Sequence, residues 1–269
     1  MVDEKLERLR DILHDLKSVL VAFSGGVDST FLLRVAHDVL GERVLAVTAV
    51  SPTYSSSETS AAQRLAEGMG VRHQFINSDE FQDEQFVRND PRRCYYCKHN
   101  LFDRLLKVAQ KEGFKHVLDG SNHDDMKDYR PGAEAIRELG IRSPLQEVGL
   151  SKDEVRRLSR QMDLETWEKP AMACLASRIP YGTALRDEDL RMVEGAEDAL
   201  TNLGYQGVRV RHHGNLARIE FRGDDLEQAL AQREEIAAAL KDLGYAYVVM
   251  DLEGYRMGSM NEVLPGSEG

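Results

Sequence analysis

The stretch Val19-Leu20-Val21-Ala22-Phe23, followed directly by Ser24-Gly25-Gly26-Val27-Asp28-Ser29, decides the fold of this chain. Five consecutive apolar residues are typical of a strand that is buried on both faces. The two glycines and two serines allow backbone N–H groups to converge on an anion, and the helix expected over 28–40 adds the positive end of its dipole. The stretch therefore predicts an anion-binding loop between a buried strand and a helix. A plain strand-to-helix turn is the alternative interpretation.

This loop differs from the phosphate-binding loop of kinases and GTPases. It lacks the Gly-x-x-x-x-Gly-Lys-Ser/Thr pattern, so the motif supplies no lysine to hold a transferring γ-phosphate. A loop of this kind can hold the pyrophosphate half of ATP while the α-phosphorus is attacked, and Asp28 can help to hold Mg²⁺ between phosphate oxygens. We therefore expect adenylation chemistry, with Asp28 as a catalytic residue. The expected nucleotide-binding residues of the loop are Ser24, Gly25, Gly26, Asp28 and Ser29.

Strand and helix patterns alternate through residues 1–168, which we expect to form one domain. The helix that precedes residue 162 has Ser151 as its expected N-cap and Glu154 at the capping-box position. Glycine follows most of the helices, where helices commonly end. This alternation predicts an α/β fold with a parallel sheet. Further strands are expected over 44–50, 71–76 and 116–120, and helices over 6–16, 58–69, 95–112 and 152–162.

The pattern changes after residue 168. Residues 169–184 are irregular and carry Cys174, so we expect a functional loop or a connection there. Beyond it, Leu-Gly-Tyr follows an expected helix and precedes an expected strand twice, at 203–205 and 243–245. Two similar helix ends and a true duplication both explain this repetition. We expect a small α+β domain over 185–264 and a disordered tail over 265–269.

Composition restricts the class of protein. A chain of 269 residues with 42% hydrophobic residues is large enough for one large domain and a smaller one. Its formal net charge of −11 argues against general affinity for nucleic acid, because phosphates favour an excess of lysine and arginine. The charged N-terminus lacks the apolar run of a signal peptide, and no stretch has the length of a membrane span. We therefore expect a cytoplasmic protein without a membrane partner.

Two of the three cysteines, Cys94 and Cys97, form a Cys-x-x-Cys pair at the start of an expected helix. A helix N-terminus and nearby cations favour the thiolate form. The pair can be a redox couple, or part of a zinc site with Cys174 and either His99 or His123. It can also join Cys174 in an iron–sulfur site, because three thiolates can hold a cluster and leave one iron open. The spacing alone leaves these interpretations open.

The loop at residues 24–29 resembles the PP-loop ATP pyrophosphatase family. A second segment, Asp119-Gly-Ser-Asn122-His-Asp-Asp125, resembles the family's Gly-Ser/Thr-Asn-x-x-Asp segment and follows the fourth expected strand. The resemblance implies a parallel-sheet PP-loop domain of the adenine nucleotide alpha hydrolase-like kind, with a second, smaller α+β domain. It also implies that Thr48 lies near the adenine. The second segment would contribute Gly120, Asn122 and Asp125 to the site for ATP and Mg²⁺.

Four further segments are similar to the LarE-type sulfur transferases, a PP-loop subfamily, and the likeness extends over about residues 16–264. These enzymes adenylate the carboxylates of pyridinium-3,5-biscarboxylic acid mononucleotide, release pyrophosphate and install sulfur as thiocarboxylates. The product leads to the nickel-pincer cofactor of lactate racemase. The resemblance implies an ATP-dependent sulfurtransferase with that substrate. The similar segments are Ala173–Gly182, Asp128–Gly132, Arg142–Leu145 and Val208–Glu220.

The family resemblance also bears on the cysteines. Some members have only the cysteine that matches Cys174 and sacrifice its sulfur, which leaves dehydroalanine. This chain matches the three-cysteine members, in which a four-iron–four-sulfur cluster (4Fe–4S) is thought to carry a transferable sulfide. The resemblance thus implies Cys94, Cys97 and Cys174 as metal ligands, and Cys174 as a catalytic residue. It further implies a homo-oligomer, a hexamer in the family, and as partners a sulfide or sulfur donor and the carboxylase and nickel-insertion enzymes of the pathway.

Arg209 and Arg211 are two residues apart on an expected strand, so both side chains point to one face and could hold the phosphate of the substrate. A solvated basic face is the alternative. Glu197 and Arg142 are the other expected substrate residues. A tRNA thiolase of the PP-loop family and a nucleotide-binding module with structural zinc are the rival functions, and the acidic net charge argues against the first.

Overall fold

The computed structural model of the chain describes residues 2–126, 131–170, 173–256 and 258–263. The chain divides into two compact units, which we call the large unit (Met1–Phe86 and Arg92–Met172) and the small unit (Val87–Pro91 and Ala173–Gly269). The amide of Asn89 donates to the carbonyls of Pro180 and Thr183, both at 2.9 Å, which holds residues 87–91 in the small unit. The predicted segment 128–130 and the predicted tail 265–269 lie outside the described residues.

The large unit contains a four-stranded sheet in the order β3-β2-β1-β4, and every pair is parallel. Its strands are β1 (Val19–Ala22), β2 (Val44–Val50), β3 (Arg72–Asn77) and β4 (His116–Leu118). The apolar residues of β1 and of most of β2 are buried, as expected for strands covered on both faces. The predicted α/β fold with a parallel sheet is therefore confirmed.

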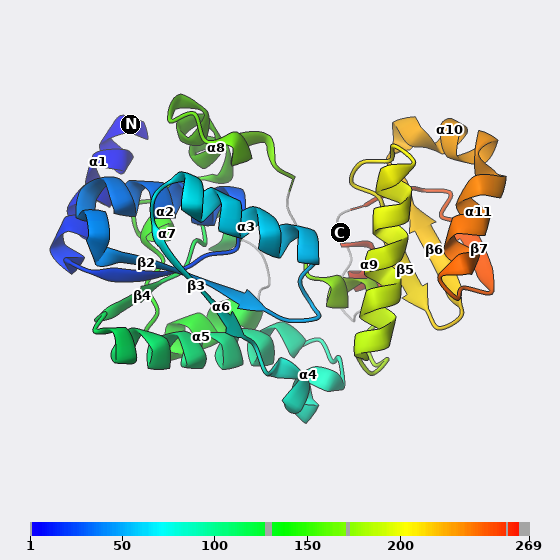
Figure 1. Cartoon of the computed structure of the whole chain (residues 1–269), viewed down its shortest axis with the longest axis horizontal. Helices are drawn as coiled ribbons and strands as arrows, with labels where there is room; N and C mark the ends of the chain where they lie inside the picture. Colours follow the sequence, from blue (N-terminus) through cyan, green and yellow to red (C-terminus); the bar gives the residue numbers. More distant parts are fainter. Residues whose placement is uncertain (1, 127–130, 171–172, 257, 264–269) are drawn as a thin grey trace. The chain divides into compact units, whose positions relative to one another are not determined.

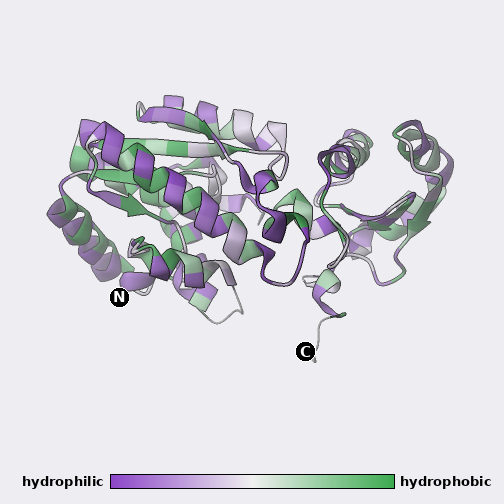
Figure 2. Ribbon diagram, turned by 90° about the horizontal axis from the view of Figure 1, so that it is seen from below, coloured by the Kyte–Doolittle hydropathy of each residue, from purple (hydrophilic) through white to green (hydrophobic). Residues whose placement is uncertain are grey.

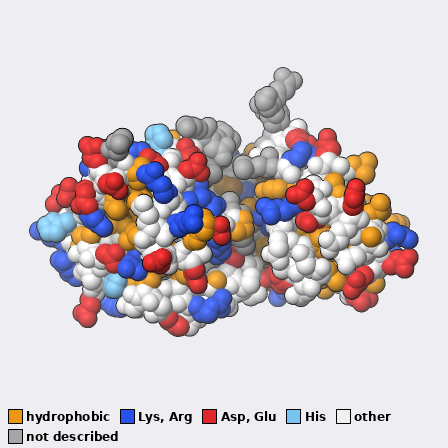
Figure 3. Space-filling view, turned by 90° about the horizontal axis from the view of Figure 1, so that it is seen from above, with side chains coloured by type: hydrophobic (Ala, Val, Ile, Leu, Met, Phe, Trp, Pro, Cys, Tyr) orange, Lys and Arg blue, Asp and Glu red, His pale blue; other side chains and the backbone are white. Residues whose placement is uncertain are grey.

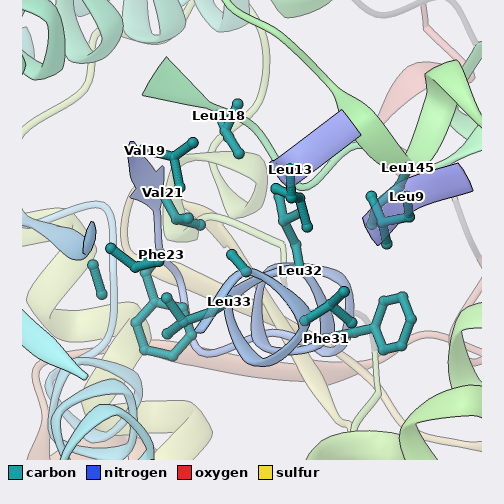
Figure 4. Close-up of a cluster of buried hydrophobic side chains, with 14 of the residues drawn as sticks. Leu9, Leu13, Val19, Val21, Phe23, Phe31, Leu32, Leu33, Leu118 and Leu145 are labelled. Atoms are coloured by element: carbon teal, nitrogen blue, oxygen red, sulfur yellow. The ribbon is translucent and has the colours of Figure 1, made fainter. Parts of the chain in front are cut away.

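Helices cover both faces of this sheet (Figure 1). One face packs against α1 (Val2–Leu16), α2 (Val27–Leu40), α3 (Ser56–Gly68) and α8 (Lys152–Gln161). The other face packs against α5 (Arg93–Glu112) and α6 (Pro131–Glu138). Leu9 and Leu13 of α1 meet Leu32 of α2 and Leu145 of α7 (Pro144–Glu147) in the close-up of Figure 4. The central strands β1 and β2 consist almost entirely of apolar residues. The helices alternate between hydrophilic and hydrophobic positions (Figure 2).

The remaining elements of the large unit are short. The helix α4 (Glu84–Val87) contains the position in the sequence, after Phe86, where the first segment of the large unit ends. Residues 80–82 form a 3-10 turn, η2 (Glu80–Gln82). The other 3-10 turns of this unit are η1 (Gly41–Arg43), η3 (His123–Met126) and η4 (Glu165–Glu168). Acidic and basic side chains are interspersed over the face of the large unit that Figure 3 displays.

The small unit has a three-stranded sheet in the order β5-β6-β7. The strand β5 (Arg209–His213) is antiparallel to β6 (Leu216–Glu220), which is parallel to β7 (Tyr247–Met250). One face of the sheet forms a core with α9 (Asp187–Asn202), α10 (Leu226–Ala231) and α11 (Arg233–Asp242). This mixed sheet with helices on one face matches the predicted small α+β fold. The 3-10 turns of this unit are η5 (Leu175–Arg178), η6 (Gly223–Asp225) and η7 (Ser259–Asn261).

The two Leu-Gly-Tyr segments end α9 and α11 in the same way. The N–H of Tyr205 donates to the carbonyl of Leu200 at 3.1 Å, and the N–H of Tyr245 donates to that of Leu240 at 3.3 Å. Each bond satisfies a carbonyl of the last helical turn, as glycine-containing helix ends commonly do. Both tyrosines are buried in the core of the small unit, so the repeated sequence has a repeated packing role.

The helix starts are partly as predicted. Ser151 and Glu154 form the predicted capping box of α8. The helix α3 begins two residues before the predicted start, because the Ser55 hydroxyl accepts the N–H of Glu58 and serves as N-cap. Within the described part of the chain, no helix is both long enough and apolar enough to cross a membrane.

Candidate functional site

The loop after β1 has a conformation that its glycines make possible. Gly25 has φ of +67°, and a Cβ built there would lie 3.1 Å from the Cα of Ala62 in α3. Only glycine fits both conditions without strain. The hydroxyls of Ser24 and Ser29 lie 3.1 Å apart, and the N–H of Gly26 donates to Ser24 Oγ at 3.3 Å. The loop is therefore already shaped around the N-terminus of α2.

A second segment approaches this loop from the end of β4. A Cβ at Gly120 would lie 3.0 Å from the backbone nitrogen of Ser29 and 3.1 Å from its Cα. The segment can come this close to the first turn of α2 only because residue 120 has no side chain. Both segments lie at the carboxyl ends of their strands, the edge where α/β sheets bind ligands. The geometry thus fits a nucleotide whose phosphates lie at the start of α2.

Asp28 links its own loop to the second segment and to a lysine of α8. Its Oδ1 accepts a hydrogen bond from the Asn122 amide at 3.3 Å, and its Oδ2 lies 2.5 Å from Lys152 Nζ. The backbone N–H of Asn122 in turn donates to Asp125 Oδ2 at 2.9 Å. The structure therefore brings Asp28, Asn122 and Asp125 together, as the sequence predicts. Oxygen ligands of this kind suit Mg²⁺.

Sequence reasoning missed three lysines that contact the loop or the second segment. Lys152 is the first residue of α8, and its backbone N–H donates to Asp124 Oδ2 at 2.9 Å. Lys169 Nζ donates to the carbonyl of Gly25 at 3.0 Å, and Lys98 Nζ lies 3.7 Å from Asp119 Oδ2. None of these lysines belongs to the loop motif. The predicted N-cap at Ser151 was the available signal for Lys152, because it fixes where α8 begins.

Thr48 is the last buried residue of β2, and its hydroxyl has two hydrogen-bond partners. It donates to the carbonyl of Phe23 at 2.7 Å and bonds Nε2 of His73 at 2.8 Å. Burial lowers the pKa of His73, so the neutral ring can donate its Nε2–H to Thr48. The hydroxyl thus links β2 to the start of β3 and to Phe23, the residue that precedes Ser24. Its predicted proximity to adenine stays a prediction.

Arg142 lies beside the second segment of the nucleotide site. Its carbonyl accepts the N–H of Asp119 at 2.8 Å, and its guanidinium donates to Glu147 Oε1 at 3.0 Å. That hydrogen bond raises the pKa of Arg142. Arg142 belongs to the large unit, whereas the other predicted substrate residues belong to the small unit.

The three cysteines are divided between the two units. Cys94 and Cys97 lie in the first turns of α5, where Cys94 is exposed, and Cys174 is the N-cap residue of η5 in the small unit. The three cysteines are not joined by disulfides, and thiolates are suitable ligands for an iron–sulfur cluster. Among the described residues, no three or more His, Cys, Asp or Glu side chains are gathered so as to hold a metal ion. The three-cysteine site stays a prediction.

Glu197 and Arg178 form a bidentate pair in the small unit. Arg178 Nε and Nη2 donate to the two carboxylate oxygens of Glu197, both at 2.9 Å, and the N–H of Val210 donates to Glu197 Oε1 at 3.0 Å. Arg178 Nη1 also donates to the carbonyls of Ala173 at 2.5 Å and Cys174 at 3.2 Å. Sequence reasoning missed Arg178, although it lies within the Ala173–Gly182 segment.

Arg209 and Arg211 are both buried, so they do not form the solvated basic face that was the alternative interpretation. Arg211 Nη2 donates to Glu220 Oε2 at 2.5 Å and to Ser259 Oγ at 3.0 Å. The guanidinium of Arg209 lies 5.6 Å from the centre of the Tyr255 ring. Burial lowers the pKa of Arg209, and the charge of Arg178 lowers it further. An anion beside Arg209 would oppose both effects.

Comparisons with known proteins identify relatives of this chain. A family model described as NAD synthase matches residues 2–117. An uncharacterised protein of Synechocystis sp. is 44% identical over 266 residues, which cover 98% of this chain and 99% of that protein. Pyridinium-3,5-bisthiocarboxylic acid mononucleotide synthase of Lactiplantibacillus plantarum is 41% identical over 253 residues, which cover 94% of this chain and 92% of that protein. A tRNA-specific 2-thiouridylase of Desulforamulus reducens is 28% identical over 194 residues, with coverage of 57% and 53%.

Proposed function

Because this chain belongs to the pyridinium-3,5-bisthiocarboxylic acid mononucleotide synthase family of PP-loop, ATP-dependent sulfurtransferases, we propose that it makes that thiocarboxylate product for nickel-pincer cofactor biosynthesis. The substrate would be the corresponding biscarboxylic acid mononucleotide. Each carboxylate would first be adenylated by ATP with release of pyrophosphate, and sulfur would then replace AMP. The contacts around Asp28 carry this proposal, because they fit an adenylation site.

Adenylation requires stabilisation of the charge that leaves with pyrophosphate. The carboxylate oxygen of the substrate attacks the α-phosphorus, the bond from that phosphorus to the bridging oxygen breaks, and pyrophosphate departs into the loop at residues 24–29. Backbone N–H groups at the start of α2 and the ammonium group of Lys152, which lies beside Asp28, would oppose its negative charge. Asp28, Asn122 and Asp125 would hold Mg²⁺, which neutralises phosphate oxygens when it is bound.

Sulfur insertion requires the acyl adenylate, because a free carboxylate has no adequate leaving group. Attack of sulfide on the acyl carbon forms a carbon–sulfur bond and expels AMP, which leaves a thiocarboxylate. Cys94, Cys97 and Cys174 would hold an iron–sulfur cluster, which supplies the sulfide when it is bound. Cys174 would lie nearest the reaction, since it is the cysteine of the Ala173–Gly182 segment. Sacrifice of the Cys174 sulfur is the competing source of sulfur.

Arg209 is the residue that we assign to the phosphate of the mononucleotide. Burial and the charge of Arg178 lower the pKa of Arg209, and a phosphate dianion would stabilise its positive charge. Arg142, Arg211 and Glu197 are the other substrate residues that the sequence predicts. The contacts of Arg211 and Glu197 suggest a different task, the positioning of the segment that carries Cys174.

The decisive experiment measures ATP turnover with and without the biscarboxylated mononucleotide. We expect release of AMP and pyrophosphate only when the mononucleotide is present, with thiocarboxylate formed in the presence of a sulfur source. Asp28→Asn serves as the inactive control. Binding of ATP without cleavage in the presence of the mononucleotide would refute the enzyme and favour a nucleotide-binding module. Tight, salt-sensitive tRNA binding would instead favour a tRNA thiolase.

A further inference from the structure

We propose that Glu197, Arg178 and Arg211 are positioning residues that hold the cysteine loop, Ala173–Arg178, in place, rather than ligands of the substrate. The inference rests on the proposed role of Cys174 in sulfur transfer. It is carried by hydrogen bonds that all lie within the small unit.

Arg178 connects the cysteine loop to α9. Its Nη1 donates to the carbonyls of Ala173 and Cys174, while Nε and Nη2 are held by the carboxylate of Glu197. The side chain of Arg178 is only 3% exposed. Bidentate guanidinium–carboxylate pairs have a fixed, planar geometry. The direction of Nη1, and with it the position of the two carbonyls, is therefore set by Glu197.

Glu197 is itself fixed by two elements. It projects from α9, and its Oε1 accepts the backbone N–H of Val210 in β5 at 3.0 Å, in addition to the contact with Arg178. Both carboxylate oxygens thus already accept charge-assisted or backbone hydrogen bonds. A substrate that bound to Glu197 would have to compete with Arg178 and Val210 for these oxygens. A positioning role, in contrast, requires these contacts.

Arg211 supports the other end of the cysteine loop. Its Nη1 donates to the carbonyl of Ser177 at 3.3 Å, and its Nη2 is held by the fully buried Glu220 and by Ser259 Oγ. Ser259 Oγ also donates to Glu220 Oε1 at 2.8 Å. The guanidinium of Arg211 is therefore anchored on one side and bonded to the loop on the other.

Together, these contacts fix the orientation of the backbone at Cys174. Its carbonyl accepts both Arg178 Nη1 at 3.2 Å and the N–H of Ser177 at 2.9 Å. Two bonds to one carbonyl fix ψ of Cys174, which is 141°. That backbone conformation sets the direction of the Cα–Cβ bond, and this direction limits the positions that the Sγ atom of Cys174 can occupy. Because small displacements of a reacting group reduce rates steeply, such anchoring is needed for sulfur transfer and not for adenylation.

The test separates adenylation from sulfur transfer in Glu197→Gln and Arg178→Lys. For each variant, pyrophosphate release, its KM for the mononucleotide and the thiocarboxylate formed per pyrophosphate are measured. Alkylation of Cys174 by iodoacetamide is followed in parallel by mass spectrometry of its peptide. We expect KM and pyrophosphate release to stay within about twofold, while thiocarboxylate per pyrophosphate falls by about tenfold to 100-fold. The alkylation rate of Cys174 should change in both variants. Glu188→Gln, an exposed carboxylate on the same helix, should leave every measurement unchanged.

A raised KM for the mononucleotide, with unchanged Cys174 alkylation and unchanged thiocarboxylate per pyrophosphate, would make Glu197 a ligand and overturn the inference. Arg178→Lys keeps the positive charge but cannot form the bidentate pair. Arg178→Lys therefore tests the positioning role if Glu197→Gln fails to fold. If the wild-type protein releases no pyrophosphate with the mononucleotide, the proposed function fails. Unchanged alkylation of Cys174 in both variants would then still overturn the positioning role.

Discussion

Asp28 and Lys152 are 124 residues apart in the sequence, yet Oδ2 of the aspartate lies 2.5 Å from Nζ of the lysine. The loop motif contains no lysine, and the fold supplies one from the first residue of α8. Lys152 is anchored through its backbone by Asp124 and through the capping box of α8. If Asp28 holds Mg²⁺ as proposed, the ammonium group of Lys152 would become available to phosphate oxygens.

We predict that Lys152→Met reduces pyrophosphate release by about 100-fold or more, as loss of one preorganised donor to a developing charge commonly does. A coupled assay of pyrophosphate at saturating mononucleotide measures this effect. Lys107→Met removes a surface lysine that is paired with Asp103 on α5, and should leave the rate unchanged. Equal rates in Lys152→Met and the wild type would remove Lys152 from the adenylation site.

Gly120→Ala should weaken ATP binding by forcing the second segment away from α2. The added Cβ would meet the backbone of Ser29 at 3.0 Å, and backbone atoms cannot move aside as a flexible side chain can. We expect the KM for ATP to rise by about tenfold, corresponding to about 1.4 kcal/mol. Isothermal titration with ATP provides an independent measurement of the dissociation constant.

Gly68→Ala is the matched control for Gly120→Ala. Gly68 ends α3, and a Cβ there meets no atom within 4 Å. Because alanine favours the helix over glycine, this change should leave ATP binding intact and stabilise the protein by up to about 1 kcal/mol. Unaltered ATP affinity in Gly120→Ala would show that the segment does not need to approach α2 this closely.

The parts of the fold that sequence predicts are those encoded locally. The apolar run before Ser24 identifies a buried strand, and the Ser151–Glu154 spacing identifies the start of α8, because both signals lie within a few residues. The small α+β unit was also predictable, from the expected helix and strand on either side of each Leu-Gly-Tyr segment. The role of Asp28 rests on the chemistry of the PP-loop motif and stays a prediction.

The parts that sequence does not predict depend on long-range pairing. Nothing near Arg211 indicates that its guanidinium pairs with Glu220 of the next strand and Ser259 of the C-terminal segment. The two-residue spacing correctly gave Arg209 and Arg211 a common face, but not their burial. Likewise, no local pattern assigns residues 87–91 to the small unit, because the side chain of Asn89 reaches partners more than 90 residues away.

The stability of the protein should fall as the pH drops below about 6.5, and His212 should account for part of this loss. His212 is buried, and burial lowers its pKa, with Asp189 opposing the shift. Since the folded-state pKa lies below that of the unfolded chain, the unfolded chain binds a proton first as the pH falls. The free energy of unfolding therefore declines from that pH downward, until the folded-state pKa is also passed.

Urea unfolding of the wild type and His212→Gln at several pH values tests this prediction. The variant should be less stable at neutral pH, because it loses the contact with the Tyr245 hydroxyl at 3.1 Å. Its stability should nevertheless depend less steeply on pH. Burial also lowers the pKa of His73, so some dependence should persist. His14→Gln, an exposed histidine on α1, should keep the wild-type slope. An equal slope in His212→Gln would contradict the assignment.

Iron content tests the source of the sulfur. If Cys94, Cys97 and Cys174 hold a cluster with three thiolates, protein purified without oxygen should contain about four irons and acid-labile sulfide per chain. Replacement of any one cysteine by alanine should remove most of this iron, because the remaining two thiolates do not complete the ligand set. Tyr96→Phe, between the two cysteines of α5, is the matched control and should retain the wild-type iron content. Stoichiometric zinc, or conversion of Cys174 to dehydroalanine within one turnover, would contradict the cluster and make Cys174 a structural ligand or the sacrificed sulfur donor.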